Sequence, residues 1–454
     1  MSILSNDHAI ELCQSLVAQS PTEETEVSLT CVEDRFVRYG AEGPTQNADR
    51  EKYEVAFRVR VPVDGQLREA RATAGSIDPD DMRAALERAL VLAHHADPVG
   101  DRPGLGGPVQ IVGSALQRPT QDHTFREKCH WIVQAREAAQ AKGLLSAGLI
   151  QTTALTRTLV NSAGRVAHGS SARAAFSVTA YEGGESGVAA SSEIVDANVD
   201  KLDVTTAIRK TVDRADASRN PQPVEAGEHT VVLQPSAVSS LLLGMSYGGF
   251  GAQEYHESRS PLCGRVGERM FPDGLCITDD PLHELYPGIP FDGEGSPTGR
   301  VDLLRHGAFT GPVTDAHWAA RLGLANTGHG QPQPSTQGPR PTHLVMSPGH
   351  QNTEQLVAGV EEGLLISQFH YTNVIDPREW LFTGMTRGGT FRIRDGKVCE
   401  PVHNLRFTQS LVEAFKRVRG IGSQLQVTGA LFGGEVLCPA LCIDGFRFTS
   451  TTAF

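Results

Sequence analysis

The sequence of 454 residues lacks the features typical of membrane, secreted and nucleic-acid-binding proteins. No stretch approaches the roughly 20 apolar residues that a membrane span needs, and residues 1–14 lack the basic start and apolar core of a secretory signal. The chain carries 41 Lys and Arg against 53 Asp and Glu, a formal net charge of −12, and contains no Lys/Arg block. Because such a chain repels phosphate backbones, we expect no binding to nucleic acid. Since no membrane span and no secretory signal are found, we expect a cytoplasmic protein that does not bind membranes.

Cysteine is too scattered to suggest a disulfide framework. No two of the eight cysteines form a CxxC pair; they are Cys13, Cys31, Cys129, Cys263, Cys276, Cys399, Cys438 and Cys442. In a chain of this length the pattern predicts reduced, mostly packed cysteines. Cys438 and Cys442 fall in one predicted strand, where residues four apart lie about 13 Å from each other. They could share a zinc ion only if the chain bends between them.

The motifs of common hydrolases are also missing. His256 and Glu257 open an HExxH zinc motif, but Ser-Arg-Ser-Pro follows, so no second His comes one turn later and Pro261 disfavours a continuing helix. There is no Gly-x-Ser-x-Gly elbow and no phosphate-binding loop. The acidic segments 279–281 and 292–295 are typical of turns, although they could bind a cation. We therefore assign no catalytic and no metal-ligating residue, while a site assembled by folding from scattered side chains stays open.

Hydrophobic patterning divides the chain into three parts. Stretches rich in proline, or in proline and glycine, at 97–108 and 219–224 mark the boundaries. We predict an N-terminal α+β domain at 1–108, a middle α+β segment at 109–225 and a β-rich C-terminal domain at 226–454.

The first two parts combine amphipathic helices with strands. Residues 53–61 alternate apolar side chains with polar ones that include Arg58 and Arg60, which is typical of a half-buried strand. We expect helices at 9–18, 79–95, 122–141 and 203–217, and further strands at 27–32, 150–160 and 174–181. This order predicts an α/β region with helices packed on a sheet.

From residue 228 onward short strand-like runs dominate, separated by Gly and Pro. The runs lie at 229–233, 299–304, 390–394 and 439–448, and helices are expected at 236–246 and 353–362. This texture favours a large barrel-like or folded-over sheet, so the fold class of the chain is α+β. Residues 330–339 read as an exposed, turn-rich loop.

A series of segments in this C-terminal half resembles the TldD/PmbA metallopeptidase family. They are YGGFGA at 247–252, GRVGE at 264–268, ITDDP at 277–281, PFDGEGSPT at 290–298, AARLGLANTGH at 319–329, GLLI at 363–366, YTNVIDP at 371–377, TGMTRGG at 383–389 and NLRFTQS at 404–410. Their order and spacing argue against a chance match, whereas the N-terminal half matches more loosely. The chain looks most similar to the TldE/PmbA-like branch of actinobacterial type.

The resemblance implies one half of a heterodimeric peptidase. In this family a TldD-like subunit holds zinc on an HExxxH helix and on a cysteine near its C-terminus, and the pair closes over a chamber in which an extended peptide is cut. Here Pro261 stands where a second His would follow His256, and the family's cysteine falls at Gly433, which has no side-chain ligand. The resemblance therefore implies a non-catalytic TldE/PmbA-like subunit without its own cofactor, with zinc in the TldD-like partner.

Six polar or aromatic residues in or beside the matched loops are candidates for contacts with the substrate or the partner: His256, Glu257, Arg259, His370, Tyr371 and Arg387. Each could equally be an ordinary surface residue. The resemblance implies an extended peptide or a small amide as substrate, cleaved in proteolysis, peptide maturation or antibiotic biosynthesis. Two alternatives stay open: an independent metal-dependent hydrolase with an assembled site, and a binding or scaffold protein.

Overall fold

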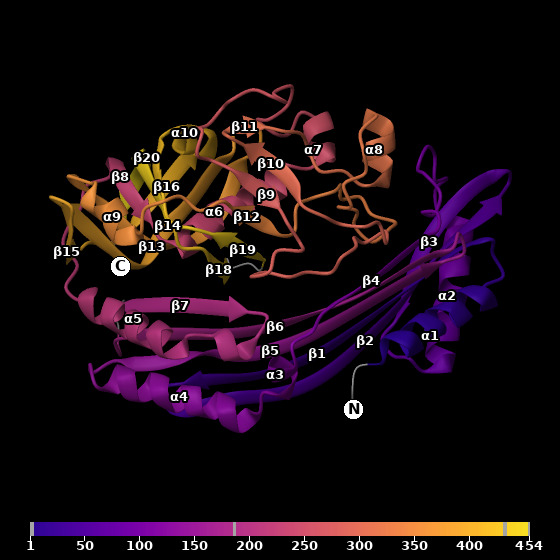
Figure 1. Cartoon of the computed structure of the whole chain (residues 1–454), viewed down its shortest axis with the longest axis horizontal. Coiled ribbons are helices and arrows are strands. Elements are labelled where there is room, and N and C mark those ends of the chain that lie inside the picture. The colour runs from indigo at the N-terminus through magenta and orange to yellow at the C-terminus, as the bar shows by residue number, and fades with distance from the viewer. Residues whose placement is uncertain (1–3, 185–187, 430–433, 453–454) are drawn as a thin grey trace.

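The computed structural model describes residues 4–184, 188–429 and 434–452, and it consists of a long sheet with a compact β-rich body over part of one face (Figure 1). The strands of the long sheet are β1 (Glu24–Gly40), β2 (Gly43–Val63), β3 (Gln66–Ala74), β4 (Val109–Ala115), β5 (Leu145–Asn161), β6 (Arg165–Tyr181) and β7 (Ala189–Asp196). They run in the order β3-β2-β1-β5-β6-β4, and β7 also pairs with β6. Only the β4–β6 pair among these neighbours is parallel.

Strands on both sides of residue 108 share this sheet, since β1 pairs with β5 from Glu26 opposite Asn161 to Tyr39 opposite Gly148. The sheet thus joins the first two predicted parts, and the three-part division of the chain stays a prediction.

The strands predicted at 27–32 and 53–61 are present but are far longer than expected. The β1–β2 ladder continues from Glu24 opposite Arg60 to Gly40 opposite Gly43. The first half of β2 is polar and mostly exposed, so apolar alternation gave no signal there. Main-chain hydrogen bonds and cross-strand pairs sustain it. One such pair joins Arg35 Nε to Asp49 Oδ1 at 3.1 Å.

The prediction of a half-buried strand at 53–61 is wrong at Arg58 and Arg60, which are 7% and 2% exposed. Their neighbours Phe57 and Val59 face the helices on the other side of the sheet. Loops of the C-terminal body and the 102–106 segment cover the face that carries the two arginines. A two-sided burial of this kind cannot be read from one strand, because the covering segments lie elsewhere in the chain.

Helices cover the face of the sheet opposite the body (Figure 1). They are α1 (Asn6–Gln19), α2 (Pro79–His95), α3 (Arg118–Asp122), α4 (Phe125–Gln140), the short η1 (Val199–Lys201) and α5 (Val204–Ala217). The helix expected at 122–141 starts instead at Phe125, because Thr124 and Glu127 form a capping box at its N-terminus. The preceding residues form the separate helix α3. In the described part of the chain, no helix has the length and apolar character needed to cross a membrane.

The C-terminal body contains a closed barrel, as the β-rich texture predicted. Its elements are β8 (Gly227–Leu233), α6 (Pro235–Gly248), α7 (Ala252–His256), β9 (Ile277–Asp279), β10 (Val301–Arg305), β11 (Ala308–Phe309), α8 (Ala316–Leu322), β12 (Leu344–Met346), α9 (Thr353–Ala358), β13 (Glu362–Asp376), β14 (Leu381–Arg394), β15 (Lys397–Pro401), β16 (Leu405–Ser410), α10 (Leu411–Lys416), β17 (Val418–Ile421), β18 (Gln426–Gly429), β19 (Glu435–Cys438) and β20 (Leu441–Thr451). The barrel runs β13-β8-β20-β16-β14 and closes through the β14–β13 pair. The α+β fold class is therefore confirmed.

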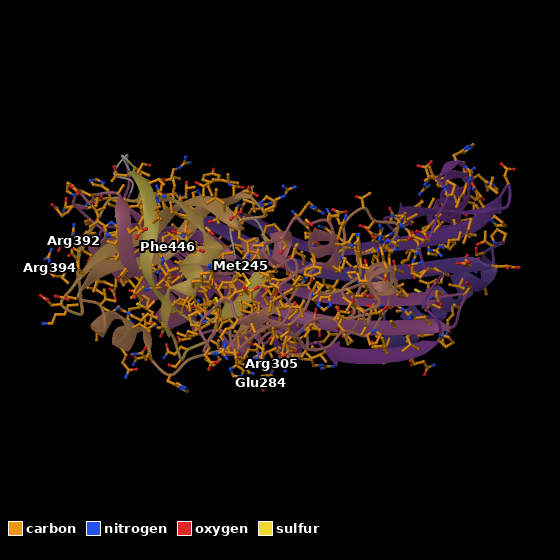
Figure 2. The ribbon with its side chains drawn as sticks, turned by 90° about the horizontal axis from the view of Figure 1, so that it is seen from above. Met245, Glu284, Arg305, Arg392, Arg394 and Phe446 are labelled. Carbon is orange, nitrogen blue, oxygen red and sulfur yellow. The ribbon has the colours of Figure 1, made fainter. Side chains whose placement is uncertain are left out.

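A second sheet of the body, in the order β11-β10-β9-β12-β19-β18, shares one large core with the barrel and α6. Met245 on α6 and Phe446 on β20 belong to this core, whereas Arg392 and Arg394 lie at the outer end of β14 (Figure 2). The strand expected at 439–448 begins two residues later, and Cys438 and Cys442 lie in different sheets. Strand β19 ends before Pro439 because proline has no N–H for a ladder hydrogen bond.

The body touches the long sheet at a few close contacts. Phe291 packs against Leu159 and Ala167 of the sheet. At Gly169 a Cβ atom would lie 2.6 Å from Pro290 Cδ, so only glycine allows this approach. On the other side, Arg173 of β6 pairs with Glu193 of β7 and with Glu435 of β19. These contacts leave hollows between the two layers.

Candidate functional site

A large hollow between the layers, which we call the sheet groove, has a volume of about 910 Å³. Its floor crosses the strands of the long sheet from β2 to β7, and its roof comes from α6, β13 and β18. The lining is mainly small or uncharged and includes Gly148, Ser177, Ser191, Ser240 and Thr428. Small side chains leave backbone groups within reach of a ligand, which suits the main chain of an extended peptide.

A second hollow of about 570 Å³, which we call the hairpin pocket, lies along the β13–β14 hairpin. His370, Tyr371 and Arg387 line it, and His370 lines the sheet groove as well. The two hollows therefore meet at His370. The hairpin is much longer than the strand predicted at 390–394, because β13 and β14 pair from Glu362 to Asp376 with irregularities on the way.

The structure brings these three predicted residues together. Arg387 Nη1 lies 2.6 Å from His370 Nε2. Since a guanidinium group only donates, Nε2 accepts this bond and the ring carries its proton on Nδ1. Partial burial, and then the charge of Arg387, lower the pKa of His370, so the imidazole is neutral at physiological pH. The Tyr371 ring packs edge-on against His370, with centroids 4.2 Å apart, from a left-handed backbone at φ 51°.

The other three predicted residues lie elsewhere, at the end of α7. The ring of His256 lies 5.4 Å from that of Trp318. Arg259 pairs with the Glu257 carboxylate at 2.7 Å, and Gln253 also donates to it. The hydrogen bond from Gln253 and the contact with Arg259 lower the pKa of Glu257. None of the three lines the sheet groove or the hairpin pocket, so the six predicted residues form two separate groups.

The geometry around α7 does not fit a zinc site. The helix ends at His256, and Ser258 takes a left-handed backbone at φ 55°. One turn after His256, the Ser260 hydroxyl is buried and donates to the Gly249 carbonyl at 2.8 Å. No group of three or more His, Cys, Asp or Glu side chains suited to a metal occurs in residues 4–184, 188–429 and 434–452. Gly433, where the family's cysteine would fall, lies outside the described residues.

The two C-terminal cysteines do not offer thiolate ligands. Cys438 is fully buried and its thiol donates to the Pro235 carbonyl at 3.4 Å. Burial raises the pKa of this thiol far above its usual range, so it stays protonated. Burial also raises the pKa of Cys442, although Arg419 lies 3.6 Å from its sulfur.

Sequence reasoning missed a buried pair in the body, formed by two residues of the matched motifs. His329 Nε2 lies 2.9 Å from Asp279 Oδ2, and Thr327 contacts the other ring nitrogen at 3.0 Å. The Thr342 and His343 amides donate to Asp279 Oδ1. Burial alone would raise the pKa of Asp279, but the hydrogen bond from His329 brings it below its usual value. Because every partner is internal, the pair ties loops of the body together.

The acidic segment at 292–295 is a turn, as its composition favoured. Asp292 accepts hydrogen bonds from the amides of Glu294 and Ser296 through Oδ1 and from Gly330 through Oδ2, at 2.7–2.9 Å. The carboxylate is saturated by main-chain donors, and this organises the turn that carries Glu294.

The matches to known proteins point to one family. Residues 226–450 match the model of the PmbA/TldA metallopeptidase C-terminal domain. A metalloprotease of Methanothermobacter thermautotrophicus is 22% identical over 342 residues, which cover 71% of this chain and 74% of that protein. Metalloprotease PmbA of Escherichia coli O157:H7 is 25% identical over 217 residues, 47% of this chain and 45% of that protein. The crystal structure of TldE from Thermococcus kodakarensis superposes with a TM-score of 0.82 at 19% identity, over 98% of this chain and 99% of that one.

Proposed function

Since this chain belongs to the PmbA/TldD metallopeptidase family, we propose that it is the TldE-like subunit of a two-subunit zinc metallopeptidase in the cytoplasm. It would bind the substrate and complete the chamber, while a TldD-like partner supplies the zinc and the cleavage chemistry. The observation that carries this proposal is the sheet groove, which meets the hairpin pocket at His370.

An extended peptide suits this groove. At about 910 Å³ it is near the upper end of small-ligand sites, which measure roughly 300–1,000 Å³. Its small and mostly uncharged lining favours contacts with a peptide main chain over recognition of one charged group. A small amide is the alternative substrate, and the same groove would hold it.

A non-catalytic role is supported by how the candidate zinc donors are used. His256 packs on Trp318, Glu257 is held by Arg259 and Gln253, and the Cys438 thiol is turned to a carbonyl group. Each of these side chains is held by an internal partner. The likeness to the TldE structure over nearly the whole chain gives further support to this branch of the family.

The β13–β14 hairpin is our candidate for the contact with the partner. Tyr371, Val374 and Ile375 are 55%, 42% and 52% exposed on β13, which is unusual for apolar side chains so close together. An obligate interface buries more than about 2,000 Å² in total and is rich in such side chains. Because Tyr371 also lines the hairpin pocket, a partner bound there would close the hollow on its open side.

The test is to purify the chain alone and with the TldD-like protein of the same genome, and to measure zinc per chain and the mass of each complex. We expect no zinc in the chain alone and one zinc in a 1:1 heterodimer. One zinc per chain in the isolated protein, lost on His256→Ala, would overturn the proposal in favour of an independent hydrolase. A chain that stays monomeric in the presence of its TldD-like partner would overturn it in favour of a binding or scaffold role.

A further inference from the structure

A third hollow lies where the long sheet meets the loops of the body, and we call it the joint pocket. Its volume is about 170 Å³. Its walls come from β2, the 102–106 segment, the turn at 294–296, the start of α8 and the loop at 333–338. Its charged lining side chains, apart from His317, are Arg58, Arg60, Arg102, Arg165, Glu294 and Asp315. Guanidinium groups thus outnumber carboxyl groups by four to two.

The two arginines from β2 are buried and keep unused donors. Arg58 and Arg60 both bond to the Glu69 carboxylate, and Arg58 also lies 3.6 Å from Glu26. Even so, Arg58 Nε and Arg60 Nη2 are buried without a hydrogen-bond partner. Glu26 Oε2 and Glu69 Oε1 of the same cluster are buried without a partner as well, but they do not line the cavity. Since Arg58 and Arg60 do line it, an oxyanion in the cavity would satisfy their free donors.

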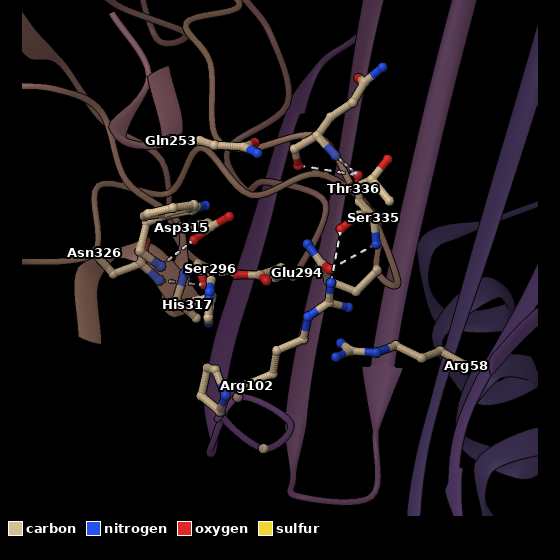
Figure 3. A pocket seen from close by; sticks show the side chains of 18 of the residues that line it. Arg58, Arg102, Gln253, Glu294, Ser296, Asp315, His317, Asn326, Ser335 and Thr336 are labelled. Atoms are coloured by element: carbon tan, nitrogen blue, oxygen red, sulfur yellow. Dashed lines mark hydrogen bonds between the residues drawn. The ribbon is translucent and has the colours of Figure 1, made fainter. Parts of the chain in front are cut away.

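Arg102 reaches the same cavity from the linker side. Its Nη2 donates to the Ser335 carbonyl at 3.4 Å, near the limit for a hydrogen bond. Figure 3 shows Arg58 and Arg102 extending into the pocket region from different segments, with Asp315 and His317 across from them. Arg165, by contrast, is committed to the Glu294 carbonyl at 2.8 Å and the Ser296 hydroxyl at 3.1 Å. Arg102 is therefore the guanidinium group best placed to meet a ligand.

We propose that the joint pocket binds a small compound with a carboxylate or phosphate group, and that its oxyanion lies against Arg58, Arg60 and Arg102. Guanidinium groups bind such oxyanions through paired, charge-assisted hydrogen bonds. The volume of about 170 Å³ resembles that of a cavity of about 150 Å³ that holds benzene, so the ligand has about that size. The site is separate from the sheet groove, and its occupancy would tie the long sheet to the body.

Glu294 makes this binding depend on pH. Burial and the neighbouring Asp292 raise the pKa of Glu294 to about 8, and Asp315 from the start of α8 acts in the same direction. Arg58 from β2 opposes the shift, and His317 belongs to the same lining. Below pH 8 the protonated Glu294 is uncharged and can donate its O–H to an oxyanion. Above pH 8 the carboxylate repels the ligand, so the affinity falls.

The experiment is isothermal titration calorimetry of the full chain with acetate, succinate and inorganic phosphate, at constant ionic strength, at pH 7 and pH 9. Wild type should bind at least one probe saturably at pH 7 and more weakly at pH 9. Arg102→Ala should weaken binding about tenfold or more, the worth of one charge-assisted hydrogen bond. Arg83→Ala, on the exposed side of α2, is the matched control and should bind as wild type does.

Glu294→Gln is the second variant and keeps an acceptor for the Ala316 amide, which lies 3.1 Å from the Glu294 carboxyl. It should bind acetate or succinate equally at pH 7 and pH 9, since the charge of these probes does not change between the two pH values. Binding of acetate or succinate alone assigns the site to carboxylate ligands, and binding of phosphate alone assigns it to phosphate compounds. Absence of saturable binding for all three probes would overturn the proposal and leave a water-filled cavity. Equal binding by wild type and Arg102→Ala, with the pH dependence kept in Glu294→Gln, would overturn it too.

Discussion

The sheet groove and the joint pocket lie between the same two layers, yet they are lined by opposite chemistry. The groove carries glycine, serine and threonine over the open part of the sheet, whereas the pocket gathers arginines where loops seal the sheet. Burial alone would lower the pKa of Arg58 there, but the carboxylates of Glu26 and Glu69 raise it, and Glu69 also pairs with Arg60. On the helix-covered face, Lys128 is buried without such a partner, and burial lowers its pKa to about 8. A carboxylate beside a buried cation thus prevents burial from lowering the pKa of that cation.

The substitution Glu69→Ala is the strongest test of whether the buried arginines need a carboxylate beside them. It leaves two buried guanidinium groups without their shared carboxylate, which we expect to cost about 3–5 kcal/mol of unfolding free energy. Urea unfolding at pH 7 measures the loss. Glu87→Ala, an exposed glutamate on α2, is the control and should change stability by less than about 0.5 kcal/mol. A loss for Glu69→Ala as small as that of the control would show that the arginines need no built-in partner.

Asp279→Asn tests the loops that form the body side of the joint pocket. It removes the charge that holds His329, and we expect a loss of about 2 kcal/mol at pH 7. The folded state lowers the pKa of Asp279 below its unfolded value near 3.9. This stabilisation is therefore complete above about pH 4 and is lost as the pH falls through the folded pKa. Urea unfolding from pH 7 down to pH 3 should show the two proteins converging in acid; a constant difference would contradict this account.

His370→Ala tests the groove in the proposed heterodimer. Loss of the imidazole removes the side chain at which the two hollows meet. We expect kcat/KM for an unfolded peptide to fall about tenfold, because one hydrogen bond contributes about 1.4 kcal/mol. His350→Ala changes an exposed histidine outside both hollows and should retain the wild-type rate. Unchanged kcat/KM in His370→Ala, with zinc and heterodimer intact, would remove His370 from the substrate path.

Lys128→Met gives the smallest expected effect. The lowered pKa of Lys128 means that between pH 8 and pH 10 the unfolded chain binds more protons than the folded one, so the stability of wild type rises over this range. The variant should lose this rise and should be more stable than wild type at pH 7 by about 1 kcal/mol. Thermal or urea unfolding at pH 7, 8, 9 and 10 checks both points. Lys52→Met, at an exposed position, should follow the wild-type profile.

The fold was predictable where packing is one-sided. Helix α2 lies where its periodicity placed it, and the Asp78 side chain caps its first turn. The strand expected at 229–233 is β8, and the β-rich texture after residue 228 becomes the barrel. The polar first half of β2 gave no signal, because an exposed stretch of a strand is held by main-chain hydrogen bonds to its neighbour rather than by a side-chain pattern.

The candidate site was only partly predictable. His370, Tyr371 and Arg387 were chosen as polar residues in matched loops, and the hairpin brings them together around one hollow. His256, Glu257 and Arg259 were chosen by the same rule but make their contacts with Gln253 and Trp318 at α7. No local signal marked the joint pocket, since its lining comes from segments spread between residues 58 and 338.

By itself the sequence determined the α+β class, the barrel-forming half, the family and the broken zinc motif at Pro261, because periodicity, composition and motif spacing are local properties. Only the tertiary structure decided that Arg58 and Arg60 are buried, that Cys438 and Cys442 lie in different sheets, and that hollows of opposite character form between the layers. The physical reason is that burial and electrostatic environment depend on what covers a residue, and here the covering segments come from distant parts of the chain.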